Sequence, residues 1–329
     1  MVLRRPGDWS LERVEALPPG PGEVRVRVHA AGICGSDREV YDGTRPLDYV
    51  RYPGTPGHEW AGTVEAVGDG VDRALTGRKT VAEGFRNCQT CERCRTGETS
   101  LCAAPYDETG FTRPGAFAAY VTVPSRLLHL LPDDADLRAA ALLEPAAVVS
   151  SALLTARPQP GERIAVVGGG TLGLIAVQLL AAYSPAELLL VEPRAERAWQ
   201  APLFGASATA HPDRAAGSFD LVVETAGAPR SAALSVALAR RGGRVVLTGI
   251  PEPGAEGIDP IDLAMRQVAV HAVFGAPSRA WSYAVRAFGT GALSPAALIT
   301  HELPLAEYGK AVQLVGSGDP EVGKVLLHP

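Results

Sequence analysis

The chain has 329 residues, enough for two domains of ordinary size, and 46% of them are hydrophobic, as in a globular protein. Its net charge of −5 gives no sign of the positive charge that binds nucleic acid or anionic membranes, so we expect neither as a partner. Residues 1–10 lack the apolar core of a signal peptide, and Ser184 and Pro185 interrupt the most apolar run, residues 172–191. These features predict a cytoplasmic protein without a membrane span.

The first part of the chain has the pattern of an irregular, mostly β domain. Val24, Val26 and Val28 alternate with polar residues, which is typical of a half-buried strand over residues 23–29. Two further strands are expected over residues 61–67 and 115–123, because short apolar runs there are bounded by Gly and Pro.

From about residue 139 the pattern changes to alternating helices and strands. An Ala-rich helix is expected from residue 139 to about 156, followed by helices at 171–182 and from residue 192 through Phe204. Apolar strands are expected at 163–167, 187–191, 219–223, 244–248 and 268–274. This alternation predicts an α/β fold with a doubly wound parallel sheet. A helix at 281–288 and a strand at 324–327 are expected to close the chain.

Four of the five cysteines lie within fifteen residues, and they are Cys88, Cys91, Cys94 and Cys102. Four thiolates at this spacing suit a tetrahedral zinc ion. The alternatives are an iron–sulfur cluster, typical of C-x2-C-x2-C-x3-C-P, and two disulfides, which a reducing cytoplasm disfavours. Zinc is favoured because the last gap is seven residues and Ala103 follows Cys102. A site with four protein ligands has no open position, so we assign it a structural role.

The fifth cysteine, Cys34, predicts a second site of different character. His58 and Glu59 follow it by fewer than thirty residues, and Glu144 is a carboxylate in an apolar stretch, where an unpaired charge would be costly. Asp37 could orient a metal-bound imidazole, and Ser36 offers a hydroxyl beside the metal. Each residue alone has an ordinary structural explanation, and only the group of them favours a metal with an open position.

A glycine-rich turn follows the expected strand 163–167. Gly168, Gly170 and Gly173 fit G-x-G-x-x-G, and Thr171 and Leu172 open the helix whose N-terminus would receive the phosphates of a dinucleotide.

The next strand ends at Glu192, which is in position to bind the ribose hydroxyls and so favours NAD. Arg194 and Arg197 follow closely and could favour the 2′-phosphate of NADP instead.

These motifs together resemble the zinc-dependent medium-chain alcohol dehydrogenase family over nearly the whole chain. The matching segments are Gly32–Asp37, Pro56–Gly62, the Cys88–Cys102 loop, Glu144-Pro145, Gly168–Gly173 and Gly323-Lys324. The resemblance implies a GroES-like, mostly β catalytic domain over residues 1–146 and 278–329. It also implies a Rossmann domain with a doubly wound parallel sheet over residues 147–277.

The resemblance further implies roles for individual residues. Cys34, His58 and Glu144 correspond to the catalytic zinc ligands, and Glu59 to a nearby acid that can exchange as a ligand. Ser36 corresponds to the first hydroxyl of the proton relay, and Lys324 to a basic residue near the coenzyme pyrophosphate. Glu39 stands where many relatives have a relay histidine, which puts the outer relay in doubt.

Within the family the chain resembles most the 2-deoxy-scyllo-inosamine dehydrogenases of aminoglycoside biosynthesis, through segments such as Cys34–Asp37, Gly57–Trp60 and Gly110–Thr112. We therefore expect a homo-oligomeric enzyme with two zinc ions per chain that oxidises a cyclitol, amino-cyclitol or polyol with NAD. The alternatives are a zinc dehydrogenase of another secondary alcohol, sugar or amino alcohol, such as sorbitol or threonine, and a non-catalytic nucleotide-binding protein.

Overall fold

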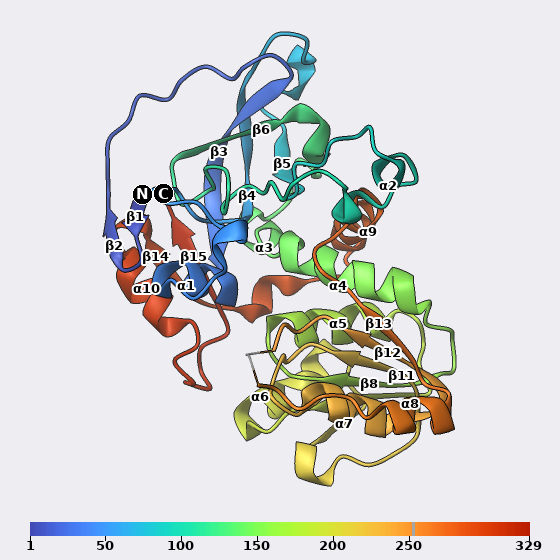
Figure 1. Ribbon diagram of the computed structural model, residues 1–329. Helices are drawn as coiled ribbons and strands as arrows, with labels where there is room; N and C mark the ends of the chain where they lie inside the picture. The colour runs from blue at the N-terminus through green and yellow to red at the C-terminus, as the bar shows by residue number, and fades with distance from the viewer. Residues whose placement is uncertain (252–253) are drawn as a thin grey trace. The chain divides into compact units, whose positions relative to one another are not determined.

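The computed structural model describes residues 1–251 and 254–329, and the chain divides into two compact units (Figure 1). Unit 1 comprises Met1–Glu144, Pro277–Gly289 and Pro295–Pro329. Unit 2 comprises Pro145–Ala276 and Thr290–Ser294.

Unit 1 is built on a seven-stranded, largely antiparallel sheet in which β3 is the central strand. β4 pairs along one side of β3, while β6 and β15 share its other side. The strands are β3 (Glu23–Ile33), β4 (Glu59–Val67), β5 (Lys79–Ala82), β6 (Tyr120–Pro124), β7 (Leu128–Leu130), β14 (Ile299–Pro304) and β15 (Lys324–His328). A separate two-stranded sheet joins β1 (Val2–Arg5) to β2 (Asp8–Ser10). The helices of this unit are α1 (Gly35–Asp42), α2 (Glu92–Arg95), α3 (Leu137–Ala140), α9 (Ser278–Gly289) and α10 (Tyr308–Leu314).

The alternation of residues 23–29 is confirmed by the burial of β3. Val24, Val26 and Val28 are buried, whereas Arg27 and His29 are exposed. The three valines belong to a hydrophobic cluster that lies wholly within unit 1. The mostly β character expected for this part of the chain therefore follows from one buried face of a long central strand.

The strand expected over residues 115–123 is shorter than predicted and begins at Tyr120. The backbone amides of Gly115 and Ala116 donate instead to the carbonyls of Thr55 and Gly57. These residues therefore hold the loop that precedes His58 instead of extending the sheet.

Unit 2 is an α/β domain with six parallel strands in the order β10-β9-β8-β11-β12-β13, which confirms the predicted Rossmann-type sheet. The strands are β8 (Arg163–Val167), β9 (Glu187–Val191), β10 (Ala208–Ala210), β11 (Phe219–Glu224), β12 (Ala239–Leu247) and β13 (Ala269–Ala272). The helices are α5 (Thr171–Ala181), α6 (Ala195–Gln200), α7 (Ser231–Leu238) and α8 (Pro260–Arg266). The strand order reverses beside β8, and the carboxyl ends of strands at such a point are where α/β proteins bind ligands.

The single helix expected from residue 139 to 156 is divided into α3 and α4 (Leu143–Ala156). Pro145 is the third residue of α4. Proline has no amide hydrogen to donate and is tolerated in the first turn of a helix but not in its interior, so a helix that contains Pro145 must begin close to it.

Among the described residues, no helix is both long enough and apolar enough to cross a membrane.

Candidate metal and coenzyme sites

The four clustered cysteines converge on one point in unit 1. The Sγ atoms of Cys88, Cys91, Cys94 and Cys102 all lie within 4.8 Å of one another, and all are free thiols. Helix α2 contributes Cys94 and starts directly after Cys91, and Cys102 follows a 3-10 turn at Thr99–Leu101. Backbone amides donate to three of the sulfurs at 3.3–3.5 Å, which favours thiolates.

The spacing of these sulfurs fits one tetrahedral ion. The Sγ atoms of Cys88 and Cys94 are 4.0 Å apart, and a tetrahedron with Zn–S bonds of about 2.3 Å has edges of about 3.8 Å. A disulfide requires sulfurs about 2.05 Å apart, so the two-disulfide alternative does not fit. An iron–sulfur cluster has several irons between its cysteines and needs wider separations. The donor set therefore fits the predicted structural zinc.

The cysteine loop is attached to the rest of unit 1 through α9. The hydroxyls of Thr99 and Ser278 are 3.4 Å apart, and the amide of Ser278 donates to Thr99 Oγ1 at 3.1 Å. Arg279 forms an ion pair with Glu98 at 2.6 Å. A metal in this loop would thus brace a segment that is joined to a helix from the other end of the chain.

The second predicted site forms where β3 ends and β4 begins. Cys34 follows β3 directly, and His58 precedes Glu59, the first residue of β4. The antiparallel register pairs Gly32 with Glu59, which places the two chain segments side by side. Ligand atoms of Cys34, His58 and Glu59 consequently lie within 4.8 Å of one another.

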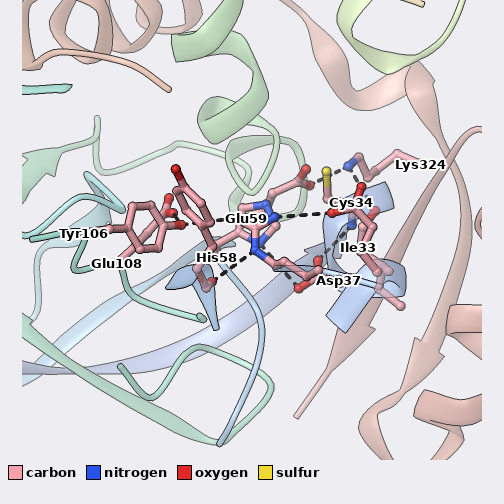
Figure 2. Close-up of polar contacts among 11 residues, drawn as sticks. Ile33, Cys34, Asp37, His58, Glu59, Tyr106, Glu108 and Lys324 are labelled. Carbon is pink, nitrogen blue, oxygen red and sulfur yellow. Dashed lines mark hydrogen bonds and ion pairs between the residues drawn. The ribbon is translucent and has the colours of Figure 1, made fainter. Parts of the chain in front are cut away.

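Asp37 supports this group from helix α1. It is fully buried, its Oδ2 accepts from the Cys34 amide at 2.9 Å, and its Oδ1 lies 3.4 Å from His58 Nδ1 (Figure 2). Burial opposes a charge on His58, but Asp37 and Cys34 together raise its pKa well above the usual range. The structure therefore places Asp37 where it can orient the imidazole, as predicted for a residue behind a metal ligand.

Glu59 is paired with Lys324, a contact that no sequence motif predicts. The buried Lys324 Nζ donates to Glu59 Oε2 at 2.5 Å and to the Ile33 carbonyl at 3.2 Å (Figure 2). The pair exists because β4 and β15 both pair with β3, one on each side. Within unit 1 the Lys324 ammonium group thus neutralises Glu59. A contact of Lys324 with a coenzyme pyrophosphate stays a prediction.

Glu144 lies close to this group but is not one of the residues within 4.8 Å of each other. It is in the first turn of α4, and burial raises the pKa of its carboxyl to about 8, with smaller effects from His58, Glu59, Glu108 and Lys324. Such a carboxyl is costly to ionise without a cation beside it. Its role as a zinc ligand stays a prediction that this environment favours.

Ser36 lies in the first turn of α1, two residues after Cys34, and is half-buried. Glu39 is exposed one turn further on, and its carboxylate lies 3.4 Å from the guanidinium of Arg45.

A polar cluster beside His58 was not predicted. Phe111 lies against the imidazole with ring centroids 4.6 Å apart, and the Arg45 guanidinium lies 3.9 Å from the Phe111 centroid. Arg45 donates to the Tyr106 hydroxyl at 3.2 Å, and that hydroxyl donates to the buried Glu108 (Figure 2). Nothing in the sequence around Glu108 distinguishes it from an acid in a polar loop.

The glycine-rich turn lies between β8 and α5 of unit 2, where it was predicted. Gly168 has a φ of +106°, and a Cβ at Gly173 would meet the Gly168 carbonyl at 1.8 Å, so both positions require glycine. Apart from Gly170 itself and its two chain neighbours, no described atom lies within 4 Å of a Cβ placed on Gly170, which leaves room for a phosphate group. Thr171 and Leu172 begin α5 as expected.

Glu192 ends the second strand but already has partners from the chain. Its carboxylate accepts from the Gly169 amide at 2.6 Å and the Arg194 amide at 3.0 Å. The Arg194 side chain donates to it through Nε at 2.6 Å and Nη2 at 3.2 Å. Burial raises the pKa of Glu192, but Arg194 and the backbone amides have the larger combined effect and lower it. Burial lowers the pKa of Arg197, and the positive charge of nearby Arg194 lowers it further.

Two family models match the chain, the alcohol dehydrogenase GroES-like domain over residues 20–133 and the zinc-binding dehydrogenase over residues 171–289. The 2-dehydro-3-deoxy-L-galactonate 5-dehydrogenase of Pseudoalteromonas atlantica is 31% identical, with 98% of this chain and 96% of the relative covered. The sorbitol dehydrogenase of Bacillus subtilis is 29% identical, with 96% and 94% covered. A Sinorhizobium meliloti 1021 protein classed as a zinc-binding dehydrogenase and solved with NADP has a TM-score of 0.92 at 30% identity, with 100% and 98% covered.

Proposed function

Because the chain belongs to the zinc-binding medium-chain alcohol dehydrogenase family, we propose that it oxidises a secondary alcohol of a polyol, cyclitol or amino-cyclitol and transfers the hydride to NAD. The observation that carries this proposal is the convergence of Cys34, His58 and Glu59 at the end of β3, supported by Asp37 and Lys324. In this proposal residues 1–146 and 278–329 form the catalytic domain, and residues 147–277 bind the coenzyme.

The charges around Cys34 fit a divalent cation. With Glu59 neutralised by Lys324, the ligands assigned to a bound cation would carry two negative charges, a Cys34 thiolate and a Glu144 carboxylate, beside a His58 that is neutral when it binds metal. We therefore assign Cys34, His58 and Glu144 as zinc ligands, with Glu59 as an exchangeable fourth. Zinc at this position would act as a Lewis acid that favours loss of the alcohol proton.

The remaining residues have supporting roles in this proposal. Ser36 accepts the proton that leaves the alcohol and passes it outward. Asp37 holds the ring of His58 and at the same time caps α1 through the Cys34 amide. By pairing with Glu59, Lys324 prevents a third negative charge from accumulating beside the Cys34 thiolate and the Glu144 carboxylate. Position 39 holds a glutamate, which is paired with Arg45, where many relatives have a relay histidine. The outer proton relay would therefore have to leave Ser36 by another route.

The relatives support the proposed substrate class. One is a sorbitol dehydrogenase and another acts on a deoxy sugar acid, and both substrates carry several hydroxyl groups. A 2-deoxy-scyllo-inosamine dehydrogenase-like activity is the specific form that we propose, from the segments around Cys34, His58 and Gly110. A dehydrogenase of another sugar or of threonine is the second candidate. Homo-oligomeric assembly and a cytoplasmic location are part of the same proposal.

The test is a screen of NADH formation with cyclitols, polyols, amino alcohols and simple alcohols, together with zinc analysis of variants. We expect activity on polyhydroxylated substrates, and we expect Cys34→Ser to lose both turnover and one zinc ion per chain. Activity confined to small aliphatic alcohols would exclude the cyclitol and polyol assignment. A Cys34→Ser variant with its full zinc content and turnover would exclude this residue as a ligand.

A further inference from the structure

Glu192 stands at the position where a Rossmann domain binds the ribose hydroxyls of NAD, yet it is saturated by the chain itself. A carboxylate accepts about four hydrogen bonds. The Gly169 amide, the Arg194 amide and the Nε and Nη2 groups of Arg194 supply four donors to Glu192. The residue is also buried. A ribose diol could bind Glu192 only after displacing the guanidinium.

Arg194 is held so that its remaining donors are available. Two of its five N–H groups face Glu192, which leaves three, five minus two, on Nη1 and Nη2. The side chain is 38% exposed, whereas that of Glu192 is 1% exposed. The guanidinium plane is thus fixed at one edge by a buried carboxylate and presents its other edge outward. This is the geometry in which arginine binds phosphate with two parallel hydrogen bonds.

The local charge also favours an anion. The Glu192–Arg194 pair is neutral, so the repulsion that a bare acid would exert on a 2′-phosphate is cancelled. Arg197 adds a second guanidinium, and the mutual repulsion of Arg194 and Arg197 contributes to the lowered pKa of Arg197. A phosphate group near both would relieve that repulsion.

We propose that Arg194 makes this coenzyme site accept a 2′-phosphate, so that the chain binds NADP more tightly than NAD and uses NADP in the proposed reaction. Glu192 is then a positioning residue for Arg194 and does not serve as the acceptor for the ribose hydroxyls. The opposing arrangement has Arg194 turning away and Glu192 binding the diol, which would make the chain selective for NAD. The inference rests on the proposed function only through the binding of a dinucleotide by unit 2.

The experiment measures nucleotide binding without substrate, by isothermal titration calorimetry of the full chain. The probes are adenosine 2′,5′-bisphosphate and adenosine 5′-monophosphate, which differ only in the 2′-phosphate. We expect the bisphosphate to bind at least about 10-fold more tightly, since charge-assisted hydrogen bonds of this kind correspond to about 10- to 100-fold in affinity. Equal binding of the two probes, or tighter binding of the monophosphate, would overturn the proposal.

Arg194→Gln assigns the effect to one residue. It should remove most of the bisphosphate advantage and change the monophosphate affinity by less than about 2-fold. Arg240→Gln is the matched control, because Arg240 is also a partly exposed arginine paired with a carboxylate, Asp220, but lies near the amino end of β12. An unchanged ratio in Arg194→Gln would contradict the proposal.

Two further readouts keep the outcomes separate. Thermal unfolding shows whether each variant is folded. If Arg194→Gln does not fold, Arg194→Lys takes its place: it keeps the charge but not the planar guanidinium, so it should retain only part of the preference for the bisphosphate. Binding of the monophosphate without preference for the bisphosphate would refute the role of Arg194 and leave the dehydrogenase proposal standing. Failure of both probes to bind would refute dinucleotide binding itself.

Discussion

Lys324 is the buried cation of the candidate metal site, and its partner Glu59 would otherwise be an unpaired buried charge. Residue types at this site were predictable because cysteine, histidine and acid in short motifs indicate metal chemistry. The pairing of Lys324 with Glu59 was not predictable, because residues 59 and 324 meet only through the pairing of β4 and β15 with β3. Sequence motifs identify donors, but long-range strand pairing decides which charges neutralise each other.

Replacing Lys324 tests the importance of this pair. Lys324→Met should lower the stability of unit 1 by about 3–5 kcal/mol, because removing one partner of a buried ion pair leaves the other charge uncompensated. Urea unfolding of the zinc-free protein, followed by circular dichroism, measures the effect. The double variant Lys324→Met/Glu59→Gln should recover most of the loss. Equal destabilisation in the single and double variants would show that Lys324 acts through packing instead of charge.

Glu144 should make the zinc-free protein sensitive to pH. Burial raises the pKa of its carboxyl to about 8, whereas in the unfolded chain the value is near 4.5. Between pH 4.5 and about 8 the folded state therefore keeps the Glu144 proton, whereas the unfolded state releases it. The contribution of this proton to the free energy of unfolding is complete below pH 4.5 and is lost as pH rises through about 8. We expect the urea midpoint of chelated protein to fall between pH 5 and 8.

The variant Glu144→Gln serves as the control, because an amide cannot titrate. Its urea midpoint should change less over the same interval than that of the parent chain. Parallel profiles for the two proteins would mean that another group dominates the pH dependence.

At the scale of elements, one strand organises the candidate metal site. β3 delivers Cys34 at its end, β4 delivers Glu59 from one side and β15 delivers Lys324 from the other. The alternation of Val24, Val26 and Val28 predicted the strand and its buried face. The Ala-rich pattern predicts one helix over residues 139–156, whereas the structure has α3 and α4, and Pro145 marks where α4 has to begin.

The ordered structure of the cysteine loop should depend on its bound metal. Cys102→Ser should leave the protein with one zinc ion instead of two, and protease should cut more rapidly between residues 84 and 104, because the loop has little regular structure besides α2 and one 3-10 turn. Zinc analysis and limited proteolysis followed by mass spectrometry measure both effects. Leu101→Ala, an exposed neighbour, should change neither. Unchanged zinc content in Cys102→Ser would remove the four-thiolate assignment.

At the scale of the molecule, each unit has a hydrophobic cluster of its own. The β and α alternation after residue 139 predicted the parallel sheet of unit 2, since parallel strands need crossover helices between them. The sheet of unit 1 could not be predicted in the same way. It pairs β3 with β15, about three hundred residues apart, and local patterns carry no record of such pairing.

This division separates metal binding from nucleotide binding. All the candidate metal ligands, from Cys34 to Glu144, belong to unit 1, whereas the Gly168–Gly173 turn, Glu192 and Arg194 belong to unit 2. Removing zinc with a chelator should therefore lower the unfolding midpoint of unit 1 and leave the affinity for adenosine 5′-monophosphate within about 2-fold, because the residues assigned to the metals and those assigned to the adenosine belong to different units. Calorimetry with the chelated and the zinc-loaded protein makes the comparison. Loss of nucleotide binding together with zinc would show that the fold of unit 2 depends on the metal sites of unit 1.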